Sequence, residues 1–174
     1  MRPVKRLSSE EGGSALIEYA MLAPVFFLLV IGLIEFVLYQ YKAYALGFVT
    51  YEAARVLQTG QVQTSADMSK AFHDQVCASS GTMIDCESIQ FDVRSFDDIS
   101  QVTYPPPQFD KDGNPINFVF EPGGAGKYSV VRSSIHHTFI TPFMSDLFDM
   151  KDSNNKNITA IVNSYCIVKN EPWS

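Results

Sequence analysis

Apolar residues are concentrated in one long run near the N-terminus. No charged residue lies between Glu18 and Glu35, and apolar residues continue to Tyr41, just ahead of Lys42. A helix over residues 19–41 would be roughly 34 Å long at about 1.5 Å per residue, enough to cross a bilayer core of about 30 Å. The pattern predicts a transmembrane helix. Glu35, near its outer boundary, could pair with a neighbouring helix or simply lie at the membrane interface.

This helix is expected to continue beyond the membrane. Residues 43–59 contain no proline, and their small side chains would let another helix approach closely. Glu52 and Arg55 are three residues apart and could pair across one turn. Gly60 is a typical C-terminal stop. The sequence predicts one helix that spans the membrane over residues 14–41 and then forms the spine of an exported domain.

The rest of the chain shows a second helical period and then a period of two. An apolar stripe predicts a short helix over residues 66–77, with Ser65 as its N-cap and Asp67 in its first turn. Alternating patterns and β-branched residues predict three strands, at residues 88–94, 128–140 and 157–168. The predicted fold class is α+β, with a long N-terminal helix packed on a small antiparallel sheet and a short second helix.

A polar, turn-rich insertion separates the first two predicted strands and occupies residues 97–127. The Asp-Gly dipeptide at 112–113 predicts a hairpin, and residues 118–120 could form a short edge strand. The interval from Asp110 to Glu121 also has the length of a calcium-binding loop. It lacks the flanking helices of an EF-hand, so the hairpin is the favoured interpretation.

Composition and motifs exclude several classes of function. The formal net charge is -6, and no basic patch with interleaved aromatic residues is present, so we expect no nucleic-acid partner. No serine lies in a nucleophile elbow, so we expect no catalytic residues, no cofactor and no enzyme activity. The adjacent His136 and His137 would point to opposite faces of a strand and could not share a metal. We expect both to be polar surface residues, and we expect no metal site.

The chain has three cysteines, all in the part that we expect to be exported. An oxidising compartment permits a disulfide. Cys77 and Cys86 are the preferred pair, because a short turn joins the end of the second helix to the first strand. Cys166 lies within a strand pattern and would then be a buried thiol. Pairing of Cys166 with either of the other two cysteines stays open.

A glycine and a glutamate mark the start of the apolar run. The segment reads Gly13-Ser14-Ala15-Leu16-Ile17-Glu18-Tyr19. A glycine at this place can be the last residue of a removed leader. Cleavage between Gly13 and Ser14 would expose a new amino group, and Glu18 of a neighbouring subunit could neutralise that group in the membrane interior.

Basic residues before the apolar run predict its orientation. Arg2, Lys5 and Arg6 should keep the N-terminus in the cytoplasm, so the part after the run would be exported. An ordinary secretion signal, cut after Ala45, is one alternative. The apolar run is longer than the core of about 7–15 residues that such signals have. An uncut anchor is another alternative, but it does not explain Glu18.

The cleavage segment resembles that of type IV prepilins, with Gly13 as the last leader residue and Glu18 as the fifth mature residue. Further segments are similar to those of TadE-like pseudopilins, the minor pilin-like proteins of tight-adherence (Flp, type IVc) pili. These segments are Ala23-Pro24, Gly32-Leu33-Ile34-Glu35-Phe36, Tyr51-Glu52-Ala53-Ala54-Arg55, Thr59-Gly60 and Val168-Lys169-Asn170-Glu171-Pro172. One departure is the acidic pair Glu10-Glu11 beside the cut, where prepilin leaders are usually more basic.

The resemblance implies a pilin-like fold and a minor pilin-like subunit. Residues 1–13 would be a cytoplasmic leader, which a prepilin peptidase removes from a precursor in the bacterial inner membrane. Residues 42–174 would form a pilin-like domain in the periplasm or in the extracellular pilus. The subunit would take part in the assembly, initiation or capping of a pilus used for adherence.

The implied partners are the prepilin peptidase, the major pilin, other minor pseudopilins, the inner-membrane assembly platform and the lipid bilayer. The alternative is an uncleaved, membrane-anchored scaffold or binding module of a secretion system. Cleavage after Gly13 distinguishes the two.

Overall fold

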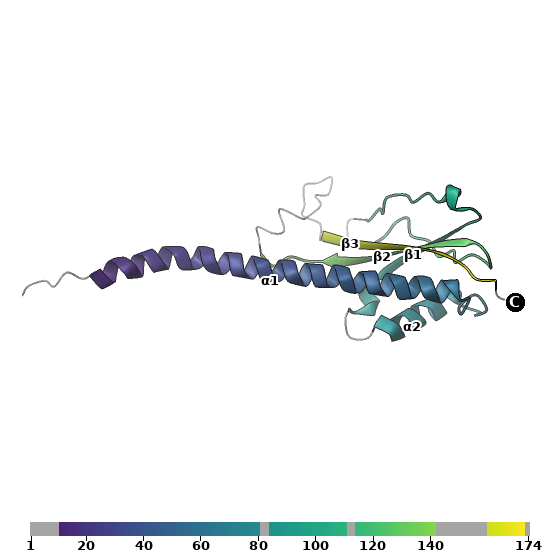
Figure 1. Cartoon of the computed structure of the whole chain (residues 1–174), viewed down its shortest axis with the longest axis horizontal. Helices are drawn as coiled ribbons and strands as arrows, with labels where there is room; N and C mark the ends of the chain where they lie inside the picture. Colours follow the sequence, from purple (N-terminus) through teal and green to yellow (C-terminus); the bar gives the residue numbers. More distant parts are fainter. Residues whose placement is uncertain (1–10, 81–83, 111–113, 142–159, 173–174) are drawn as a thin grey trace, which may run out of the picture.

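The fold is α+β, as predicted, and is dominated by one long helix (Figure 1). The computed structural model describes residues 11–80, 84–110, 114–141 and 160–172. The helices are α1 (Glu11–Gln58) and α2 (Met68–Ser80), with single 3-10 turns η1 (Cys86–Ser88) and η2 (Ile99–Gln101). The strands are β1 (Gln90–Phe96), β2 (Tyr128–His137) and β3 (Ala160–Lys169).

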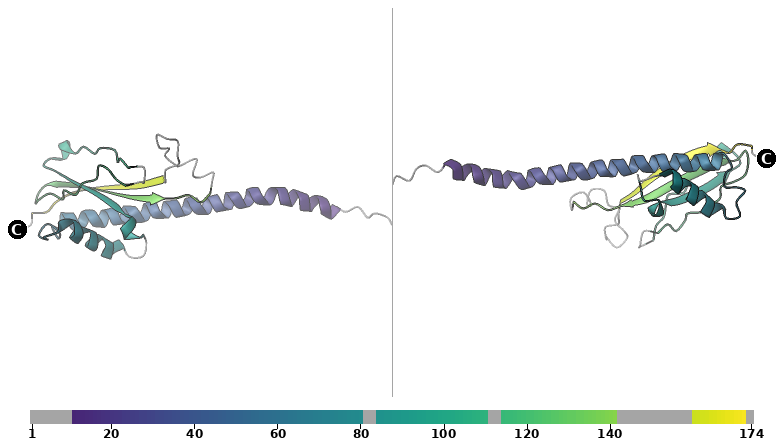
Figure 2. Two further views of the ribbon diagram at one scale, coloured as in Figure 1. Left: turned by 180° about the vertical axis from the view of Figure 1, so that it is seen from behind. Right: turned by 90° about the horizontal axis from the view of Figure 1, so that it is seen from below.

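Helix α1 is much longer than the domain that packs on it, so its first half projects alone (Figures 1 and 2). Nearly all side chains from Gly13 to Ile34 are exposed, whereas Leu46, Val49 and Leu57 are buried against the domain. Pro24 lies within the helix and does not end it. Of the described part of the chain, α1 is the one helix long and apolar enough to cross a membrane.

The three strands form one antiparallel sheet in the order β1-β2-β3. Strand β2 is central, and α1 packs against one face of β2 and β3. The alternation predicted for the last strand is confirmed: Ala160 and Val162 are buried, while Ile161 between them is partly exposed. The predicted positions 157–159 lie outside the described residues. The core therefore lies between the second half of α1, one side of α2 and one face of the sheet.

Helix α2 begins two residues later than predicted and ends three residues later. The reason for the later start is its cap: the carboxylate of Asp67 accepts a hydrogen bond from the backbone N–H of Lys70 at 3.0 Å. Asp67 rather than Ser65 is thus the capping residue. The backbone N–H of Ser65 instead donates to the carbonyl of Val62 at 3.1 Å, within the turn after α1.

The insertion between β1 and β2 forms a second cover for the sheet. Phe120 pairs with Val93 of β1 in a parallel bridge, which confirms the expected edge segment. The backbone N–H of Asp110 donates to the carbonyl of Asn114 at 2.8 Å, as expected for a hairpin. The turn residues 111–113 lie outside the described residues. The central strand is consequently buried on both faces, between α1 and the insertion.

Candidate functional site

The expected processing and assembly residues lie on the projecting part of α1. Gly13, Ser14 and Glu18 are all exposed. A Cβ atom added to Gly13 would meet no atom within 4 Å, so packing in the monomer does not require glycine there. Glu18 forms no hydrogen bond or ion pair with the rest of the described chain. All three residues are therefore free to meet other proteins.

Exposed apolar residues also run along α1 beyond the predicted membrane segment. This α1 stripe consists of Phe27, the half-buried Val30, Ile34, Val37, Tyr41, Tyr44, Phe48 and Tyr51. Its spacing alternates between three and four residues, as at the a and d positions of a heptad. Tyr44 is 76% exposed, whereas Leu46 and Ala53, on the opposite side of the helix, are fully buried by the domain. From Tyr44 to Tyr51 the stripe thus faces away from the chain's own core.

The predicted ion pair between Glu52 and Arg55 is not formed. Within the described ranges, ion pairs join Asp92 to Arg94 and Arg132, and Lys127 to Asp97. Arg55 is exposed and Glu52 is half-buried. An exposed pair of this kind contributes only about 0–1 kcal/mol, so hydration of the separate charges competes with it.

Glu35 lies where the segment after β2 meets α1. Its side chain is only 6% exposed. The carboxylate accepts hydrogen bonds from the backbone N–H groups of Ile140 and Thr141, which follow β2; the Thr141 bond is 3.1 Å long. Its partner is therefore the backbone of the same chain. Glu35 joins the long helix to the end of the central strand.

His137 is buried, contrary to the expectation of a surface residue. It is 5% exposed and packs against the rings of Tyr39 and Phe139, with centroid distances of 5.4 and 4.6 Å. Neither ring nitrogen has a hydrogen-bond partner in the described part of the chain. Burial lowers the pKa of His137, and the nearby positive charge of Lys42 lowers it further. The expected opposite orientation of His136 is confirmed, since its ring lies near Phe109 of the insertion.

A buried arginine, which the sequence reasoning missed, fixes the insertion to the sheet. Arg132 of β2 is fully buried and pairs with Asp92 of β1. Its guanidinium carbon lies 4.7 and 4.6 Å from the ring centres of Tyr104 and Phe118. Its Nη1 donates to the carbonyl of Pro105 at 2.9 Å. The sequence signal that could have revealed this ion pair was one acidic and one basic residue, each in the middle of a predicted strand.

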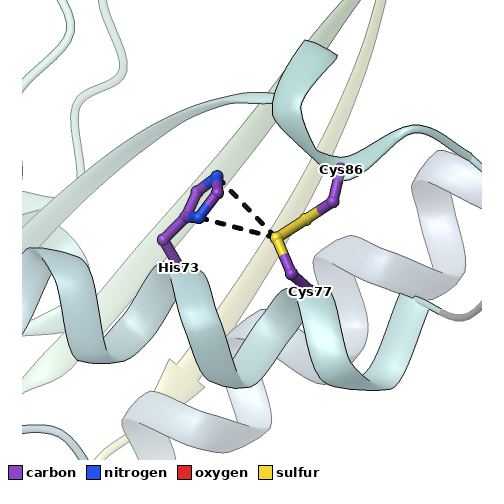
Figure 3. Close-up of side chains that lie close together, drawn as sticks. All are labelled: His73, Cys77 and Cys86. Atoms are coloured by element: carbon purple, nitrogen blue, oxygen red, sulfur yellow. Dashed lines mark hydrogen bonds between the residues drawn. A yellow bond between two sulfur atoms is a disulfide. The ribbon is translucent and has the colours of Figure 1, made fainter.

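The preferred disulfide between Cys77 and Cys86 is present and ties α2 to η1 (Figure 3). His73 lies one helical turn before Cys77, and its Nδ1 is 3.6 Å from the Cys77 Sγ. Both sulfur atoms are used by the disulfide, so of these three side chains only His73 could offer a metal ligand in the oxidised chain. Cys166 is a free, half-buried thiol whose pKa is raised by burial.

Comparison with known proteins bears on the first part of the chain. A family model described as TadE-like protein matches residues 13–55. No curated protein and no solved structure matches the chain. The matched segment starts at Gly13, covers most of α1 and includes Glu18, Glu35 and the whole α1 stripe. Residues 13–55 are therefore similar to TadE-like proteins.

Proposed function

We propose that the chain is a minor pseudopilin of a Tad pilus system. A prepilin peptidase cuts it between Gly13 and Ser14, and the mature subunit takes part in the assembly, initiation or capping of the pilus. It is not an enzyme. The family match over residues 13–55 supports a role in this system.

The observation that carries the proposal is the α1 stripe. A helix that only anchored a domain would need apolar residues inside the bilayer, but water would face any that continued beyond it. Tyr44 and Tyr51 continue the stripe alongside the exported domain and are 76% and 59% exposed. A second long helix passing through the same membrane, with the same orientation, would cover them. A neighbouring pilin-type subunit supplies such a helix.

The exposure of the N-terminal residues is compatible with processing. Gly13 has no packing role in the monomer, which supports a role for it in recognition at the cleavage site. Glu18 is free to neutralise the new amino group of Ser14 on the adjacent subunit, because no group of the described chain pairs with it. Charge neutralisation is worth most in the low-dielectric membrane interior.

Site-specific photo-crosslinking tests the stripe. A benzoylphenylalanine replaces Tyr44 in cells that carry the complete pilus system and, in a second strain, Tyr165, which is 52% exposed on β3. We expect the Tyr44 position to give a covalent adduct with another pilin-type subunit, identified by mass spectrometry. Tyr165 is the control because it is also an exposed tyrosine and lies outside the stripe.

Two results would contradict the proposal. One is the absence of any pilin-type adduct from the Tyr44 position while the pilus assembles. The other is the same adduct, in the same yield, from both positions, because it would show that the stripe has no special part in the contact. A static anchor predicts the first result.

A further inference from the structure

A cavity of about 450 Å³ lies where the domain meets the projecting half of α1. Its apolar wall comes from one side of the helix and from the segment after β2, with Ile31, Ile34, Leu38 and Ile140. Its polar groups are Glu35, Lys42, His137 and Thr138. The cavity therefore combines an apolar wall with charged groups of both signs.

The position of this cavity matches the outer surface of a membrane. Glu35 follows Ser14 by 21 residues, which corresponds to about 32 Å along a helix. The bilayer core is about 30 Å thick. With the first half of α1 in the bilayer, Ile31 and Ile34 lie at the outer edge of the hydrocarbon core, and Lys42 lies among the lipid headgroups. This placement rests on the membrane location in the proposed function.

The two charged groups of the cavity lie at different heights along α1. The carboxylate of Glu35 is held by the backbone N–H groups of Ile140 and Thr141 and is fixed in place. Lys42 is two helical turns further from the membrane and forms no ion pair within the described ranges. Both residues lie close enough to His137 to change its pKa, in opposite directions. A negative charge, on Glu35, and a positive charge, on Lys42, thus face the same cavity.

His137 supplies independent evidence for a ligand. A buried polar group normally has a hydrogen-bond partner, yet both ring nitrogens of His137 lack one in the described chain although the residue is 5% exposed. It lines the cavity. A neutral imidazole can donate one hydrogen bond, so an oxygen acceptor within the cavity would satisfy it.

We propose that this cavity binds one zwitterionic phospholipid of the surrounding membrane. Lys42 and His137 hold the phosphate, the ammonium group of an ethanolamine headgroup lies toward Glu35, and an acyl chain covers Ile31 and Ile34. The opposite charges of the headgroup match those of Lys42 and Glu35. An anionic headgroup without the ammonium would leave Glu35 facing negative charge, so it would bind less well.

Native mass spectrometry of the full chain in mild detergent tests this assignment. Phosphatidylethanolamine or phosphatidylglycerol is titrated into the micelles, and bound lipid is counted per chain. We expect phosphatidylethanolamine to bind about tenfold more tightly, as expected for one favourable charge contact. Lys42→Gln should weaken that binding about tenfold. Lys70→Gln, the same change at an exposed position on α2, should leave it unchanged.

Glu35→Gln gives a second, sharper test, because glutamine keeps an oxygen that can accept from Ile140 and Thr141 but removes the charge. It should abolish the preference for phosphatidylethanolamine. Equal binding of both lipids to the wild-type chain, or unchanged binding by Lys42→Gln, would overturn the lipid site. Carbonate extraction of membranes separates the two proposals: release of the chain would overturn the membrane location as well, whereas an integral chain without lipid selectivity would overturn this site alone.

Discussion

Arg132 on β2 lies directly opposite Asp92 on β1, and the two fully buried side chains form an ion pair. This pair faces the insertion rather than α1. The Arg132 guanidinium also lies over the ring of Tyr104 and donates a hydrogen bond to the carbonyl of Pro105. The Asp92 carboxylate also accepts a hydrogen bond from the backbone N–H of Val119 at 3.0 Å. One buried ion pair therefore holds two separate parts of the insertion, residues 104–105 and Val119, against the sheet.

Loss of Asp92 should strongly destabilise the domain. Asp92→Ala leaves the Arg132 guanidinium buried without its counter-charge, and removal of one partner of a buried pair costs about 3–5 kcal/mol. Urea unfolding of the full chain in detergent, followed by near-ultraviolet circular dichroism of the tyrosines, measures the loss. Asp97→Ala is the control: Asp97 belongs to an exposed pair with Lys127 and should change stability by about 0–1 kcal/mol. Equal effects of the two variants would refute a structural role for the buried pair.

Removal of the Glu35 carboxylate should loosen the end of the central strand. In Glu35→Ala the backbone N–H groups of Ile140 and Thr141 lose their acceptor, and hydrogen bonds to a charged group contribute about 1.5–3 kcal/mol. Hydrogen exchange of these two amides should become faster by at least about tenfold. Glu52→Ala, a change at a half-buried glutamate of the same helix, should leave them protected. Unchanged exchange in Glu35→Ala would mean that other contacts hold the segment.

The disulfide should stabilise the chain by closing a short loop. Its cysteines are nine residues apart, and loop-closure entropy for such a length corresponds to about 2–3 kcal/mol. Replacement of both Cys77 and Cys86 by serine should lower the free energy of unfolding by this amount. Cys166→Ser, which removes the free thiol, should have the smaller effect. An effect of Cys166→Ser as large as that of the double replacement would indicate that Cys166 takes part in the stabilising bond in the cell.

Glu18 should be needed for assembly and not for processing. In Glu18→Ala we expect the leader to be removed normally, because the cut lies five residues earlier, while incorporation into pili falls sharply for want of a partner for the new amino group. Immunoblots of whole cells and sheared pili measure the two steps separately. Glu52→Ala serves as control. Normal incorporation of Glu18→Ala would refute the neutralisation role.

The apolar pattern was sufficient to predict the main elements. The single long run predicted α1, and alternating patterns together with β-branched residues placed all three strands within a few residues of their observed bounds. The start of α2 was missed because Ser65 and Asp67 are both good capping residues, and only the geometry selects between them. Local sequence patterns therefore predicted which elements form, but they predicted the first residue of each element less accurately.

Long-range contacts explain the remaining differences. His136 and His137 were both expected at the surface as polar residues, but α1 and the insertion together bury both faces of β2. The partners of Glu35 are backbone N–H groups more than 100 residues away, which no side-chain pattern reveals. For the same reason the sequence offered Glu35 two possible roles and could not choose between them.

The central claim is that the chain is a processed pilin-type subunit, and its most direct test is the intact mass and N-terminal sequence of the protein. The protein is purified from membranes of cells that carry the matching prepilin peptidase, with a peptidase-inactive strain as control. We predict a chain that begins at Ser14, and at Met1 when the peptidase is inactive. A chain that begins at Met1 in both strains would contradict the account and favour a static anchor, and one that begins at Leu46 would identify an ordinary secreted domain.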